Sequence, residues 1–169
     1  IKLVDPDGKE VYGASFAFGG AGVIGAKSQT MVMLDDKKYD VYISTSVNPS
    51  IGIMKEVGVS KFTTTSETVK DFMEADWLSI EGGISVISGE IGLANSKNGG
   101  VDILKSYGLG KKSSLGGMFN FYCPSINAGT TTKKIKDKKT ALTIIKGLQK
   151  AGLVDQEVAN KAIKYWENK

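Results

Sequence analysis

Large residues alternate with small or polar ones through most of the first 123 residues, and this alternation constrains the fold more than any other feature. Tyr12, Ala14, Phe16 and Phe18 alternate with glycine, serine and alanine, and a period of two residues is typical of a β-strand with two unlike faces. Turn residues separate the runs, as at 95–100. The pattern predicts about seven to nine antiparallel strands joined as a meander. Similar alternation covers residues 29–34, 39–47, 51–60, 80–93, 101–109 and 115–123.

Glycine is unusually frequent, at 21 of 169 residues, where about 7% is ordinary. Glycine weakens a strand, but it is tolerated where a sheet bends sharply or where another group comes close. A closed barrel needs such bends. The glycine pairs at 19–20, 82–83 and 116–117 therefore favour a small barrel, and a two-sheet sandwich with glycine bulges is the alternative. The structural glycines expected to tolerate no side chain are Gly82, Gly89 and Gly116.

Residues 130–169 differ from the rest in charge and in period. They carry ten lysines and four acidic residues, whereas residues 1–129 carry twelve lysines and fourteen acidic residues. Leu142, Ile145 and Leu148 have helical spacing, and Gly152 and Asp155 suit a helix end and a new helix start. We therefore expect a C-terminal helical hairpin after a basic linker, and a short acidic helix or turn within 66–77. The expected organisation is a junction at 1–10, a glycine-rich β domain at 11–129, and a basic linker with two helices at 130–169.

The composition excludes much chemistry. The chain has no histidine and no arginine, and its one cysteine is Cys123. A catalytic triad, a Cys–His pair and a histidine-ligated metal are therefore impossible within this chain, as is an internal disulfide. We expect no metal, no cofactor and no conventional acid–base enzyme.

Three residues remain as candidate catalytic groups. Ser44, in a Ser-Thr-Ser run, together with a later glutamate resembles mono-ADP-ribosyltransferases, although the arginine or histidine with which that family holds NAD is missing. Glu81 and Glu90 could form a carboxylate pair for glycoside hydrolysis. Their odd spacing places them on opposite faces of one unbroken strand, unless a bulge at 82–83 resets the faces. Two solvated surface charges are the interpretation that we favour over such a pair.

A lysine cluster at 133–139 is the sharpest charge feature. It could bind an anionic membrane surface or nucleic acid, but nucleic-acid sites usually add arginine and stacking aromatics, and neither is interleaved here. Nucleic acid is therefore not expected as a partner, and a solvated linker is the alternative. The cluster consists of Lys133, Lys134, Lys136, Lys138 and Lys139.

The stretch Leu-Val-Asp-Pro-Asp-Gly-Lys-Glu-Val at 3–11 resembles the end of the Rhs/YD-repeat core of bacterial polymorphic toxins. A variable C-terminal toxin domain follows that core, and the glycine-rich alternation after residue 12 is similar to glycine-rich β domains in such positions. The resemblance implies a bacterial protein that is secreted or delivered into a target cell, and a cognate immunity protein as partner. The chain departs from that pattern in having no upstream repeat and no nuclease, deaminase or peptidase motif known from these toxins.

These observations lead to one main hypothesis and two alternatives. The main hypothesis is an antibacterial effector domain that acts on membranes or lipids without acid–base catalysis. The first alternative is a small β-barrel binding module for an apolar ligand. The second is a toxin similar to ADP-ribosyltransferases that uses the Ser44 region.

Overall fold

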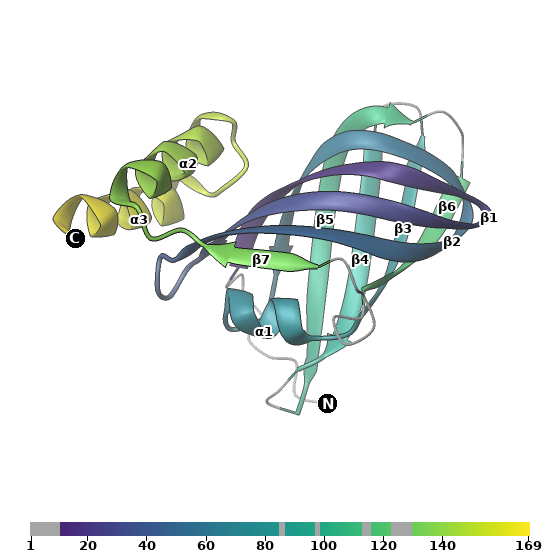
Figure 1. Ribbon diagram of the computed structural model, residues 1–169, viewed down its shortest axis with the longest axis horizontal. Coiled ribbons are helices and arrows are strands. Elements are labelled where there is room, and N and C mark those ends of the chain that lie inside the picture. The colour runs from purple at the N-terminus through teal and green to yellow at the C-terminus, as the bar shows by residue number, and fades with distance from the viewer. Residues whose placement is uncertain (1–10, 85–86, 97–98, 113–115, 123–129) are drawn as a thin grey trace.

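A computed structural model describes residues 11–84, 87–96, 99–112, 116–122 and 130–169 (Figure 1). The predicted junction at 1–10 and Cys123 lie outside the described residues. The elements in chain order are β1 (Val11–Asp35), β2 (Val41–Thr64), α1 (Val69–Glu74), β3 (Trp77–Ile84), β4 (Ile87–Asn95), β5 (Val101–Lys112), β6 (Gly116–Tyr122), β7 (Thr131–Lys134), α2 (Lys138–Lys150) and α3 (Gln156–Asn168).

The predicted β-barrel with a C-terminal helical hairpin is confirmed. One seven-stranded antiparallel sheet runs in the order β1-β2-β5-β4-β3-β6, and β6 pairs back onto β2, which closes the wall. The register carries a continuous path round the barrel and back to β1. That path is Tyr12, Thr63, Lys105, Ile91, Ile80, Phe119, Ile51 and Ile24.

The long strands β1 and β2 form a ribbon that folds over near its middle (Figure 1). The two halves of β1 then lie side by side, so closely that a Cβ on Gly25 would be 1.8 Å from the Gly20 carbonyl oxygen. A Cβ on Gly19 would be 2.3 Å from the oxygen of Ala26. On β2, Gly52 has φ +149°, and a Cβ there would be 2.3 Å from the Gly117 carbonyl oxygen. Glycine is required at these positions because a side chain has no space there.

We call the end where β1 and β2 fold over the tip. β3 passes to β4 there, and β5 passes to β6. The opposite end, the base, holds both ends of the folded ribbon together with α1, β7, α2 and α3. The two ends therefore differ greatly in size.

Helix α1 packs against an apolar part of the lumen at the base. Phe72 stacks against Phe62 and lies 5.2 Å, between ring centroids, from Trp77, whose indole Nε1 donates to the Phe72 carbonyl at 2.9 Å. Val69 and Met73 complete its buried face. Next to this region burial raises the pKa of Asp102, although the hydroxyl of Ser66 donates to its carboxylate.

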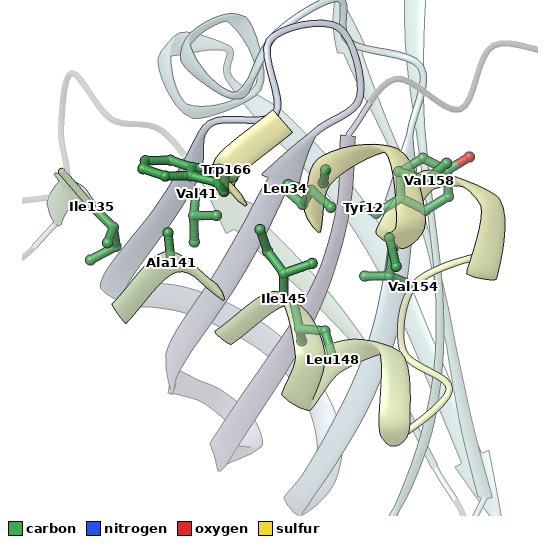
Figure 2. Packing of buried hydrophobic residues seen from close by; sticks show 12 residues of the cluster. Tyr12, Leu34, Val41, Ile135, Ala141, Ile145, Leu148, Val154, Val158 and Trp166 are labelled. Carbon is green, nitrogen blue, oxygen red and sulfur yellow. The ribbon is translucent and has the colours of Figure 1, made fainter. Parts of the chain in front are cut away.

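Helices α2 and α3 pack on the outside of the base (Figure 2). Asp137 caps α2 by accepting from the Thr140 backbone N–H at 2.7 Å, and these hydrogen bonds lower the pKa of Asp137. Gly152, at φ +69°, ends α2 as predicted. The helices cover an outer apolar patch that would otherwise be exposed. The cluster contains Tyr12, Leu34, Val41, Ile135, Ala141, Ile145, Leu148, Val154, Val158, Ala159, Ala162 and Trp166.

Two local predictions differ from the structure. The run at 80–93 is two strands, because Ile84 and Ile87 are register partners at the end of a hairpin. The expected linker contains strand β7, which pairs with Tyr42–Thr45 of β2. Its threonines are β-branched and suit a strand. In the described part of the chain, no helix is both long enough and apolar enough to cross a membrane.

Candidate functional site

The wall of the barrel is apolar outside and polar inside over its middle. Along β3, Leu78 and Ile80 are exposed whereas Ser79 and Glu81 are buried. The same period of two gives β2 its buried Asn48 and exposed neighbours. A soluble barrel places its apolar residues on the buried face, so this polarity is reversed.

The outward apolar side chains form a continuous surface that we call the outer belt. Isoleucine dominates it, and Ile80 is 57% exposed. Contiguous apolar surfaces larger than a few hundred Å² mark protein or membrane contacts. The belt consists of Phe16, Phe18, Val23, Ile24, Val47, Ile51, Ile53, Val57, Val59, Leu78, Ile80, Ile84, Ile87, Ile91, Leu93, Tyr107 and Phe119.

The belt has a limited height. From Ile87 to Leu93 on β4 there are six residue steps, which is ~20 Å along a strand and ~15 Å along the barrel axis at a tilt of ~40°. Lys61 and Lys105 lie on the outward face beside the belt residues Tyr107 and Ile91, which are their register partners. Their long side chains can carry the ammonium groups past an apolar layer. The apolar band is therefore shorter than the ~25 Å of typical membrane barrels.

A charged cluster lies in the lumen behind the belt. Lys27 Nζ lies 2.9 Å from Glu81 Oε2 and 3.2 Å from Glu90 Oε2. The side chains of these residues are only 4%, 3% and 14% exposed. The Asn120 amide donates to Glu81 Oε2 at 3.2 Å, and Ser79 donates a short hydrogen bond to Glu90. We call these five residues the lumen cluster. Its one lysine and two glutamates satisfy one another because buried charges need partners.

The lumen around this cluster is almost filled. The remaining cavity has a volume of about 40 Å³ and is lined mainly by polar side chains, including Gln29, Asn48 and Ser106. Such a space suits a water molecule, whereas small-molecule sites measure ~300–1,000 Å³. A barrel of this size is usually filled by its own side chains. This cavity, as the described residues enclose it, is therefore too small for a sugar, a dinucleotide or a fatty acid.

The structure brings two of the predicted catalytic residues together and leaves the third apart. Glu81 and Glu90 are register partners on adjacent strands, so both face inward. The predicted surface location was wrong. A hairpin turn between the two glutamates places them on adjacent strands, so they share the inner face despite their odd spacing in the sequence. Ser44 is fully buried, and its hydroxyl lies 3.0 Å from Thr132 of β7. The three residues do not form one site.

The outer face also carries a groove beside the belt. Its volume is about 520 Å³, and apolar side chains of β3, β4 and β5 line most of it. The apolar lining consists of Leu78, Ile80, Ile91, Leu93 and Tyr107, all of which belong to the belt. Gly89 keeps the floor of the groove low because it has no side chain.

The lysine cluster lies at the base, on β7 and the start of α2. All five of its side chains are in exposed residues. Lys134 forms an ion pair with Asp40 at 2.5 Å, and this hydrogen bond raises the pKa of Lys134. Lys138 donates to the Glu167 carbonyl oxygen. Binding to an anionic surface stays a prediction for this cluster.

The structural glycines are not the ones that the sequence suggested. A Cβ on Gly82 would meet nothing within 4 Å, and one on Gly89 would have its nearest neighbour at 3.8 Å. A methyl group therefore has space at Gly82 and at Gly89, and the prediction that these two positions tolerate no side chain was wrong. Gly116 is the first residue of β6, and the space around its Cα is not among the features that the structure describes. Glycine is instead required at Gly19, Gly25 and Gly52.

Sequence reasoning missed Lys27, Ser79 and Asn120 as members of the lumen cluster. Lys27 is a lone lysine between Gly22 and Thr30 in a stretch of small and apolar residues. Its position in an alternating run was the available signal, because the same parity places it with Gln29 and Met31 on the inner face. The partner glutamates could not be assigned without the register.

Among the described residues, no group of three or more His, Cys, Asp or Glu side chains could hold a metal ion. Comparisons of the chain with protein-family models, with characterised proteins and with solved structures found no match.

Proposed function

We propose that this domain is a membrane-inserting β-barrel whose outer belt contacts the acyl chains of a bilayer. The reversed polarity of the wall carries this proposal. Apolar residues on the outside and bonded polar residues on the inside are the arrangement that lipid demands, because every strand hydrogen bond is made within a closed sheet. A barrel exposed to water over the same surface would aggregate.

The small cavity of the lumen favours anchoring in the bilayer, or disturbance of the bilayer, over an open pore as the mode of action. The cavity beside the lumen cluster measures only about 40 Å³, and α1 side chains pack at the base, so no open channel runs between the described residues. A band of ~15 Å is shorter than the ~30 Å hydrocarbon core, and such a mismatch thins the surrounding bilayer. We therefore expect leakage through disturbed lipid around the barrel.

The effector hypothesis is a wider proposal that agrees with this activity. A domain that disturbs bilayers needs none of the histidine or arginine chemistry that the chain lacks. Delivery into a target cell and an immunity protein remain predictions from the family resemblance.

The outer groove supports a second candidate, a binding module for an apolar ligand. Its volume of about 520 Å³ and apolar lining would fit an acyl chain. This site lies on the outer wall, because the polar lumen offers no space for such a ligand.

Vesicle flotation tests the proposal against this alternative. The purified protein should float with vesicles of short-chain phosphatidylcholine and phosphatidylglycerol and resist extraction by high salt and carbonate. Ile91→Lys should reduce flotation, because a lysine on the lipid face costs ~2–4 kcal/mol near the bilayer centre. Ala151→Lys, at an exposed position after α2, is the matched control and should float as the parent does.

The outcomes separate the two candidates. Protein that stays in the soluble fraction with every vesicle composition, yet binds a fluorescent fatty acid with one-to-one stoichiometry, would replace insertion with ligand binding. Equal flotation of the Ile91→Lys and Ala151→Lys variants would refute contact between the belt and lipid.

A further inference from the structure

The two ends of the barrel carry very different charge. At the tip, residues 18–26, 82–84 and 87–89 contain no Asp, Glu, Lys or Arg. The remaining tip segments contribute only Lys55 and Glu56 near the bend of β2, and Lys111 and Lys112 at the end of β5. The tip is therefore small, rich in glycine and low in charge.

The base carries most of the charge. Residues 130–169 alone contain ten lysines and four acidic residues. Helix α1 and its flanks add one lysine, Lys70, and four acidic residues, Glu67, Asp71, Glu74 and Asp76. The helices are held there by the buried cluster of Figure 2. Ile135 is part of that cluster, and its backbone N–H donates to the Val41 carbonyl oxygen at 2.8 Å. The segment that leads to α2 is therefore fixed to the barrel.

We infer that the barrel enters a bilayer tip first and leaves α2 and α3 on the side from which it approached. This inference rests on the proposed insertion and adds its direction. A segment that crosses the hydrocarbon must give up its hydration, so the end with few charges is the one that can cross. The base would have to carry its charged helices through the same layer.

The lysines of the base would then lie at the headgroups of the near leaflet. Lys133, Lys136 and Lys139 are exposed, whereas Lys146 and Lys161 form ion pairs with Glu167 and Glu157. Residues 130–169 carry ten lysines against four acidic residues, and this local excess of positive charge complements anionic phospholipid. The attraction to such a surface acts within about a Debye length. This contact orients the barrel before insertion.

Site-specific labelling tests the orientation. In a Cys123→Ser background, a single cysteine is placed at the tip as Gly22→Cys or at the base as Ala151→Cys. Gly22 is exposed, and a Cβ there meets nothing within 4 Å. Each variant is added to preformed phosphatidylcholine–phosphatidylglycerol vesicles and recovered by flotation. It is then treated with a membrane-impermeant maleimide before and after detergent.

The inference predicts that floated Ala151→Cys is labelled without detergent, and that Gly22→Cys is labelled only after detergent opens the vesicles. Labelling of both cysteines, or of Gly22→Cys alone, in protein that floats and resists carbonate refutes the orientation but leaves insertion standing. A protein that never floats refutes the insertion and the orientation together.

Discussion

Lys27→Met should destabilise the barrel strongly, because Lys27 is the cation that the structure places between Glu81 and Glu90. Both ion pairs are short, at 2.9 and 3.2 Å, and the lysine side chain is 4% exposed. Removing one partner of a buried ion pair costs about 3–5 kcal/mol, because the remaining charge stays out of water. That loss is a large part of the ~5–15 kcal/mol that typically stabilises a domain.

The assay is guanidinium unfolding in detergent micelles, followed by circular dichroism. With a slope of ~2–6 kcal/mol per molar guanidinium, the midpoint should fall by on the order of 1 M. Lys27→Met combined with Glu81→Gln should recover much of the loss, because the double variant no longer holds two buried carboxylates without a cation. Lys146→Met is the control, since its pair with Glu167 is more than half exposed and should contribute under ~1 kcal/mol. A single variant as stable as the control, or a double variant no better than the single, would refute the charge balance of the lumen cluster.

Three further predictions test other parts of the structure. Gly25→Ala should prevent β1 from folding over, because a Cβ on Gly25 would be 1.8 Å from the Gly20 carbonyl oxygen. Gly82→Ala should change the free energy of unfolding by no more than ~0.5 kcal/mol. Loss of the strand signal in circular dichroism in both variants, or in neither, contradicts the assignment. Burial raises the pKa of Tyr12 to about 12, and the negative charge of Asp155 is the second cause. The unfolded chain therefore loses this proton at a lower pH than the folded chain, so the contribution of Tyr12 to stability is complete below pH ~10 and is lost between pH ~10 and ~12. Tyr12→Phe should show a smaller fall, measured by circular dichroism against pH, and an unchanged fall would remove Tyr12 as a cause. Replacing Lys133, Lys134, Lys136, Lys138 and Lys139 by glutamine should weaken binding to anionic vesicles at low salt by up to ~1 kcal/mol per lysine; unchanged binding would return the cluster to a solvated linker.

The period of the sequence was sufficient to predict the antiparallel strands and the helical hairpin, whereas the choice of a barrel over a sandwich depended on the glycine pairs. Alternation over 12–18 places Phe16 and Phe18 on one face, and helical spacing of Ile145 and Leu148 gives the buried stripe of α2. These features are local, so they can be read without knowing which strand pairs with which. The period did not reveal which face points into the barrel. Alternation separates the residues of the two faces, but it is the same whether the apolar face points inward or outward.

The lumen cluster depends on contacts between distant parts of the chain. Lys27 and Glu81 are 54 positions apart, and their meeting is fixed by the path of pairings through β2, β6 and β3. Glycine composition alone likewise did not distinguish Gly82, which has open space, from Gly25, which is closed by the Gly20 carbonyl. That difference arises from how the ribbon folds over, which no short segment encodes.

The central claim is that the outward face of the wall contacts lipid, and a nitroxide scan of residues 78–84 on β3 tests it most directly. Single labels are introduced in the Cys123→Ser background, and collision with oxygen, which concentrates in the bilayer, is measured on protein floated with vesicles. The account predicts high oxygen accessibility at Leu78, Ile80, Gly82 and Ile84 and low accessibility at Ser79 and Glu81, with a period of two residues. Equal accessibility along the strand, or higher accessibility at Ser79 than at Ile80, would contradict it.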